Sequence, residues 1–297
     1  MRITNNATLR SSLASLNLNR SAIDTLQSQI SSGVRVQKPS DDPGAVHEVM
    51  QSSSSLTALD QYNKNVQSAT SRNSMEGSVT TQLNNVMARA KELMVAQNTG
   101  TATVASRQTA AAEMEQLFNT AVNLSGSKFG GEYLFGGDDV KNPPFTSTGT
   151  GASLDFTTTA SSGARSVAVG SGQQIVATHD GQQLFANSGV LASLRDATRA
   201  LQSGDQTTVG NAIPALDTAF DNVQTLQGEQ GARANALDVA SQNVTALKAN
   251  LTAYRSQLQD VDIQSAVTSL VTKQTSYQAA MLATSKILGM TLTDYLR

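Results

Sequence analysis

The chain has 297 residues, a formal net charge of −2, two histidines and no cysteine. The near-neutral charge and the lack of a Lys/Arg run argue against nucleic-acid binding, and the absence of cysteine excludes disulfides and thiolate metal sites. Aromatic residues make up 4% and charged residues 15% of the chain, a composition that favours long helices with thin apolar seams over a compact enzyme.

The amino-terminal segment, residues 6–31, is predicted to form a helix with one apolar seam. Its large apolar residues follow an alternating four–three spacing: Leu9, Leu13, Leu16, Ile23 and Ile30. This spacing places them on one stripe, which needs a partner helix to be buried. The first residues lack the apolar core of a secretory signal, so we expect a cytosolic protein or one exported without a cleavable signal.

A connector is expected at residues 33–42, where Gly, Pro and two acids interrupt the periodicity. Asp42-Pro43 then favours a helix start, because Asp caps free backbone amides and Pro fits the first helical position. We predict helices over residues 43–97 and 103–124, separated by a short turn. No stretch approaches the ~20 apolar residues that a membrane span requires.

The amino-acid composition changes between residues 125 and 185, where Gly and Pro become frequent and the helical spacing of apolar residues disappears. Short β-prone runs occur at residues 133–135, 154–157, 167–169 and 174–177. Asp180-Gly181 predicts a hairpin turn between short strands. Together these features predict a small β domain inserted into a helical chain.

Helical periodicity returns at Val190 and continues to the carboxyl end. One segment is expected at residues 205–227, and a longer one with heptad spacing follows Gly228-Glu229-Gln230-Gly231. The heptad register skips at residues 260–262, which indicates a bend or a change of partner. A second seam follows, formed by Ile263, Val267, Leu270, Tyr277, Met281 and Leu288.

Each terminal seam is too narrow to be buried alone, so we predict that the two ends of the chain pair in one coiled coil. The predicted fold is mainly α, a long antiparallel helical and coiled-coil rod with a small inserted β domain. The expected domains are residues 1–42 with 260–297, residues 43–135 with 188–259, and residues 136–187. The seam residues are the predicted assembly interface, and changing both Leu13 and Leu270 to Asp is expected to abolish assembly.

Three stretches of the sequence resemble the flagellin superfamily, and more narrowly its hook–filament junction members. Near the amino end, QISSGVRV at residues 29–36 is followed by SDDP at 40–43. In the middle, GEYLFGG at 131–137 is followed by Pro144-Phe145. At the carboxyl end, YQAAM at 277–281 leads into SKIL at 285–288.

The resemblance implies a structural subunit of the bacterial flagellum, located outside the cell after type III export and forming the junction between hook and filament. It implies as partners a ring of further copies, a second hook-associated junction protein, flagellin, a cytoplasmic export chaperone and the flagellar export apparatus. We expect no catalysis, no cofactor or metal, no nucleic acid and no membrane insertion.

Three other functions compete with this interpretation. A filament-forming flagellin would share the architecture, but when purified it would extend into long filaments. A secreted enzyme carried on a coiled-coil export domain would need its chemistry in the β region, which holds one histidine and few acids. A cytosolic coiled-coil scaffold would not explain two interrupted termini.

The residues capable of chemistry also have structural interpretations. His47 and His179 are both expected at the surface, without the neighbouring ligands that a metal site or a nucleophile–histidine pair requires. Asp41-Asp42 is expected to cap a helix, and Asp138-Asp139 to form a turn rather than a calcium loop.

Overall fold

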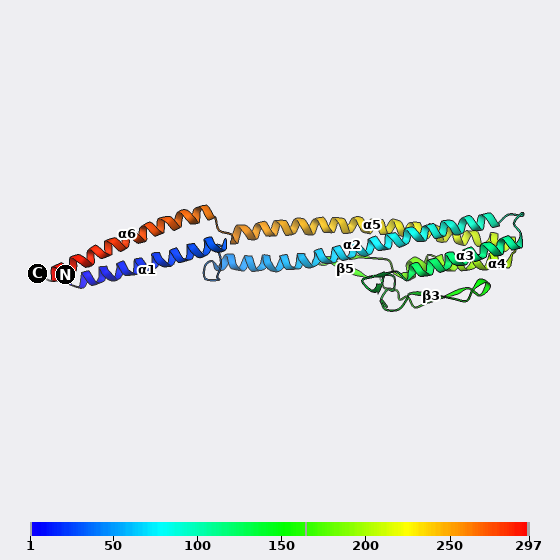
Figure 1. Cartoon of the computed structure of the whole chain (residues 1–297), viewed down its shortest axis with the longest axis horizontal. Coiled ribbons are helices and arrows are strands. Elements are labelled where there is room, and N and C mark those ends of the chain that lie inside the picture. Colours follow the sequence, from blue (N-terminus) through cyan, green and yellow to red (C-terminus); the bar gives the residue numbers. More distant parts are fainter. Residues whose placement is uncertain (1, 164, 296–297) are drawn as a thin grey trace. The chain divides into compact units, whose positions relative to one another are not determined.

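The computed structural model describes the backbone of residues 2–163 and 165–295, and their side chains except at positions 2–6, 8, 9 and 287–295. The helices are α1 (Arg2–Ser32), α2 (Pro43–Gln97), α3 (Val104–Ser125), α4 (Val190–Ser203), α5 (Gln206–Gln259) and α6 (Ile263–Tyr295) (Figure 1). The strands are β1 (Lys128–Phe129), β2 (Glu132–Tyr133), β3 (Phe145–Thr148), β4 (Asp155–Thr158), β5 (Ser166–Gly170) and β6 (Gln173–Val176). The mainly helical fold with a small β insert is confirmed.

Side-chain caps start several of the helices. Helix α2 begins at Pro43, as predicted, and the Ala45 N–H donates to the Asp42 carboxylate at 3.1 Å. Asp262 caps α6 in the same way, accepting from the Gln264 N–H at 3.1 Å. Such caps satisfy amides that have no partner inside the helix. Helix α1 starts at Arg2, four residues before the predicted position, so the amino-terminal helix is longer than expected.

The chain divides into two compact units, residues 1–58 with 248–297 and residues 59–247. The finer three-part division of the sequence stays a prediction. In the second unit, α3 and α4 pack together, and the main core gathers apolar side chains from these helices, from α2 and α5, and from the insert. Its largest fully buried side chains include Phe118, Phe135 and Phe185.

The insert consists of three two-stranded antiparallel sheets, β1–β2, β3–β4 and β5–β6, and the predicted runs at 154–157, 167–169 and 174–177 overlap β4, β5 and β6. The hairpin between β5 and β6 turns at residues 171–172, where Gly172 has a φ of +73°. The predicted hairpin turn at Asp180-Gly181 is wrong. The Asp180 carboxylate instead accepts the Gln183 N–H at 2.7 Å and starts the π-helical turn Gln182–Asn187, because Asp caps helical turns as readily as it forms hairpins.

Candidate assembly surface

Helices α1 and α6 lie side by side in the first unit (Figure 1). The seam residues Leu16, Ile23, Ile30, Leu270 and Tyr277 are half-buried. On α6, Ala266 and Thr284 are buried as well. The predicted pairing of the two ends of the chain is therefore confirmed within one molecule.

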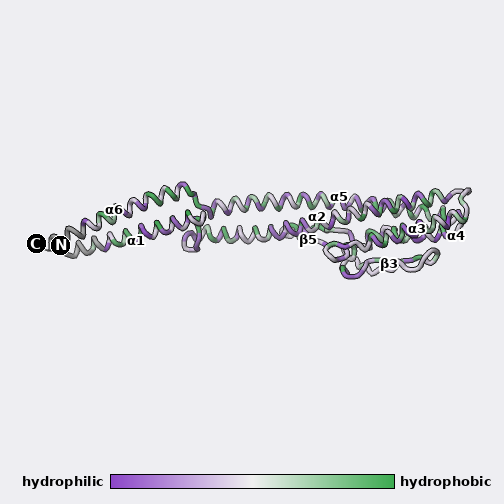
Figure 2. Tube along the Cα trace, in the orientation of Figure 1, coloured by the Kyte–Doolittle hydropathy of each residue, from purple (hydrophilic) through white to green (hydrophobic). Residues whose placement is uncertain are grey.

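The remaining described seam residues are not covered by this pairing. Leu13 of α1 is 49% exposed, and a set of large apolar side chains on α6 is between 41% and 66% exposed: Ile263, Val267, Val271, Met281 and Leu282. We call this set of five the outer stripe. Figure 2 shows apolar residues recurring between polar ones along α6. Val271 and Leu282 were not predicted from the sequence, because they lie outside the heptad positions. The side chains of the predicted seam residues Leu9 and Leu288 lie outside the described residues.

Helical geometry separates the outer stripe from the side that faces α1. At 3.6 residues per turn, residues eighteen apart in sequence point in the same direction. Ala266 and Thr284 form such a pair on the buried side of α6, and Ile263 and Met281 form another on the exposed side. The two directions differ by about 60°, since adjacent residues are rotated by about 100°. Helix α6 is thus apolar over a wider face than α1 alone can bury.

The connector after α1 and the break before α6 are joined to each other. Val34 and Asp260 form an isolated antiparallel bridge, and the Arg35 N–H donates to the Gln259 carbonyl at 2.7 Å. The Val261 N–H donates to the Gly33 carbonyl at 3.0 Å. The two interruptions predicted from the sequence therefore meet, and backbone hydrogen bonds fix the point where both terminal helices begin or end.

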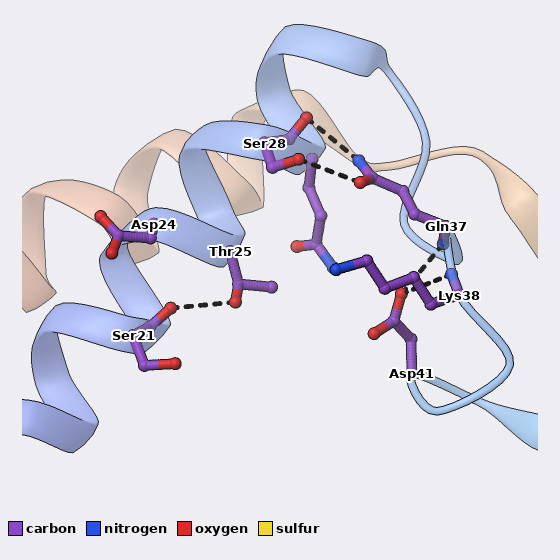
Figure 3. A pocket seen from close by; sticks show the side chains of 8 residues that line it. Ser21, Asp24, Thr25, Ser28, Gln37, Lys38 and Asp41 are labelled. Carbon is purple, nitrogen blue, oxygen red and sulfur yellow. Dashed lines mark hydrogen bonds between the residues drawn. The ribbon is translucent and has the colours of Figure 1, made fainter.

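A polar cavity of about 230 Å³ lies beside the connector (Figure 3). It is lined by Ser21, Asp24, Thr25, Ser28, Gln29, Gln37, Lys38 and Asp41. The Asp41 carboxylate accepts the N–H groups of Gln37 and Lys38 at 3.0 and 2.8 Å, and the Gln37 amide bonds to Ser28. These bonds hold the connector against α1, so the polar side chains organise the bend.

The predicted helix cap is confirmed for Asp42 and the predicted turn for Asp139, whereas Asp41 bonds to amides of the connector and not to the helix. The pKa of Asp42 is lowered by the Ala45 backbone N–H and by the nearby Arg35 guanidinium, whose Nη1 lies 3.4 Å from the carboxylate. Asp139 accepts from the Asn142 side chain and from the Lys141 N–H, which lowers its pKa and closes a turn. Neither pair forms part of a metal cluster, since no group of three His, Cys, Asp or Glu ligands gathers among the described residues.

The two histidines differ from each other. His47 is exposed, as predicted, but the expectation for His179 is wrong: it is buried between Glu76 and Glu229. Both carboxylates are distant in sequence, so no local pattern predicts the contact.

Within the described ranges, no helix is long and apolar enough to span a membrane.

Comparison with known families matches both helical ends of the chain. The family model described as bacterial flagellin N-terminal helical region matches residues 3–139, and the bacterial flagellin C-terminal helical region matches residues 213–296. The chain is 26% identical to flagellar hook-associated protein 3 of Escherichia coli, over 89% of this chain and 90% of that protein. The protein of the same name from Salmonella typhimurium is also 26% identical, over 90% of each chain.

Solved structures with the same fold include FlgL of Bacillus cereus, with a TM-score of 0.58 and 20% identity, covering 69% of this chain and 99% of that one. The flagellar hook associated protein-3 of Legionella pneumophila gives a TM-score of 0.63 at 13% identity, over 71% of this chain and 98% of that one. At these identities the likeness concerns the fold.

Proposed function

The chain belongs to the bacterial flagellin family, and from this membership we propose that it is a structural, non-catalytic subunit of the junction between the flagellar hook and filament. The observation that carries the proposal is the outer stripe of α6, an apolar surface that α1 leaves uncovered. Both curated relatives are flagellar hook-associated proteins, and the same role makes this chain a component of the flagellum outside the cell.

Burial of the outer stripe supplies the driving force for assembly. Burying one Val, Leu, Ile or Met side chain completely stabilises an assembly by about 1.5–3 kcal/mol relative to leaving it in water. The half-buried seam residues hold α1 to α6 inside each molecule, while the outer stripe and Leu13 pack against helices of neighbouring copies in a ring. This division of labour is a proposal for the residues predicted as the assembly interface.

The further partners follow from a place between hook and filament. One edge of the ring contacts a second hook-associated junction protein, and the other receives flagellin. Before export, a cytoplasmic chaperone covers the apolar stripe, since a helix with such a face binds in a hydrophobic groove. The flagellar export apparatus then carries the chain outward, and because the sequence has no cysteine, no disulfide can trap it on the way.

A strain that lacks this chain tests the proposed function. We expect an intact hook, no attached filament and unpolymerised flagellin in the medium, because flagellin has no surface to add to. A plasmid copy of the chain should restore attached filaments. Normal filaments in the deletion strain would contradict the proposal, and a filament lost without any shed flagellin would identify the chain as the filament subunit itself.

A further inference from the structure

Four ionisable side chains meet in the second unit, where the chain leaves β6 and returns to the helices. Glu76 of α2 is fully buried, and His179 is 2% exposed. The His179 ring contacts the Glu76 carboxylate through Nδ1, and its Nε2 lies 3.0 Å from a carboxylate oxygen of Glu229 on α5. Arg233 lies 3.7 Å from each carboxylate. We call these four residues the latch.

The geometry of the latch fits a doubly protonated imidazole. A neutral ring donates a hydrogen bond through one nitrogen only, whereas both nitrogens of His179 face carboxylate oxygens. With the second proton in place, the imidazolium and Arg233 balance the charges of Glu76 and Glu229. Glu76 is fully buried, so its charge needs a partner, whereas the Glu229 side chain is 57% exposed and also reaches water.

The latch lies at the base of the β5–β6 hairpin, which we call the arm (residues 166–176). The arm rests on a small apolar cluster that is separate from the main core and is formed by Ala69, Ala177 and Leu237 with Val167 and Ile175. The Asn65 side-chain amide also donates to the Ala168 carbonyl of the arm, at 2.9 Å. The apolar surface beneath the arm is therefore small.

We propose that the protonation state of His179 controls the position of the arm. Doubly protonated His179 holds the arm against α2 and α5, and loss of one ring proton releases it. In the neutral ring, one nitrogen lone pair faces a carboxylate, and Arg233 alone opposes two negative charges. The sign follows directly: the arm is held at lower pH and released as the pH rises.

The other charged groups around His179 do not replace the missing proton. Asp180, on the same segment, is engaged by the Gln183 N–H at 2.7 Å. One side of His179 is lined by Arg72 of α2, Arg165 beside the arm, and Tyr133. Both arginines form ion pairs with Glu132, at 3.2 Å for Arg72 and 2.8 Å for Arg165. These two guanidinium groups share one carboxylate, so one positive charge remains on that side of His179, but both side chains are engaged by Glu132 rather than by the latch.

The test follows the ring proton and the arm together in the full-length protein. Nitrogen-15 NMR of histidine-labelled protein gives two ring systems, and exposed His47 serves as the internal reference. Hydrogen exchange of residues 166–176 is measured over the same pH series, corrected for intrinsic exchange and compared with α3. We expect both ring nitrogens of His179 to be protonated while the arm is protected, and arm exchange to rise at least tenfold as that ring loses a proton.

Three variants make the test specific. His179→Gln should leave the arm in fast exchange at every pH, while His47→Gln should behave as wild type. Glu76→Gln should keep the arm protected at high pH, because its amide can donate to Nδ1 while Nε2–H donates to Glu229. The proposal would be overturned if one nitrogen of His179 were unprotonated while the arm is protected, or if the exchange rate of the arm did not change when the ring loses a proton. If His179→Gln does not fold, the result for Glu76→Gln still decides.

Discussion

At the scale of one residue, Arg107 shows how a buried cation holds the ends of helices together. Its side chain is largely buried and donates to three backbone carbonyls, those of Gln97 at 3.1 Å and of Thr99 and Gly204 at 3.0 Å. The planar guanidinium offers five donors in fixed directions, which suits three carbonyls that converge from two loops. One side chain thus joins the α2–α3 turn to the end of α4.

Replacing Arg107 with Met should lower the free energy of unfolding by about 2–4 kcal/mol, because buried carbonyls left unpaired cost about 1–3 kcal/mol. Denaturant titration of the two proteins measures the difference. Arg89→Met is the matched control, since Arg89 makes its ion pairs with Glu92 and Glu113 at an exposed site. Equal losses in the two variants would refute the role assigned to Arg107.

The capping aspartates predict a specific sensitivity to acid. The pKa of Asp42 is lowered chiefly by the Ala45 N–H, and that of Asp262 chiefly by the Ser265 hydroxyl. A lowered pKa in the folded state means that the stabilisation exists above the unfolded value, roughly 3.9, and is lost as the pH falls through the lower folded value. The starts of α2 and α6 should therefore weaken in acid.

Circular dichroism between pH 7 and pH 2 checks this, using the double variant Asp42→Asn with Asp262→Asn. Asn still caps a helix but does not titrate. The wild-type protein should lose more helical signal in acid than the variant, and superimposable acid curves would contradict the prediction.

Single residues differ in how well their contacts could be predicted from the sequence. The Asp42 cap is readable because Asp and Pro stand together before an apolar repeat. The surroundings of His179 are not readable, since Glu76 and Glu229 come from two helices and meet it only through the tertiary fold.

At the scale of one element, α6 explains why the predicted seam was too narrow. A heptad pattern assigns apolar residues to a single stripe, and Val271 and Leu282 fall outside it. The helix instead carries a buried side facing α1 and an outer stripe that begins about 60° from it, at Ile263 and Met281, and extends to about 160°, at Leu282. Pairing could be predicted from spacing, but the split between inward and outward residues required the neighbouring helix.

Helix α5 differs from the sequence-based expectation in another way. It runs without a break from Gln206 to Gln259, through Gly228 and Gly231, where one predicted segment ends. Each glycine costs a helix roughly 1 kcal/mol relative to alanine. Buried Val223 and Leu237, on either side, offset that cost through packing that a local pattern does not reveal.

These two glycines offer a stabilising change. Space is open around both positions, with no atom within 4 Å of an added Cβ. Gly228→Ala with Gly231→Ala should raise the free energy of unfolding by about 1–2 kcal/mol, measured by denaturant titration. Gly204→Ala is the opposing control and should destabilise, because Gly204 has a φ of +71° and an added Cβ would lie 2.8 Å from Val104. A destabilised double variant would show that α5 needs its glycines.

At the scale of the whole molecule, the two units differ in how much of their apolar surface they bury. The second unit has a main core of fully buried side chains, whereas the paired terminal helices leave Leu13 and the outer stripe in water. Regions with few buried contacts open at low free energy. We therefore expect the terminal helices to be stabilised mainly by assembly.

Hydrogen exchange on the free monomer measures this difference. Amides of α1 and α6 should exchange much faster than those of α3 and α4, and should become protected in isolated hook–filament junctions. Strong protection at both ends of the chain in dilute monomer would contradict the expectation.

The most direct measurement places two acids on the outer stripe and asks whether filaments still attach. A strain lacking the chain is complemented with Val267→Asp plus Val271→Asp, or with the control Ser269→Asp plus Ser276→Asp, which adds equal charge to exposed polar positions of the same helix. The account predicts that both proteins are exported, that only the control restores attached filaments, and that the stripe variant leaves bare hooks and free flagellin in the medium. Normal filaments carrying the stripe variant would contradict it.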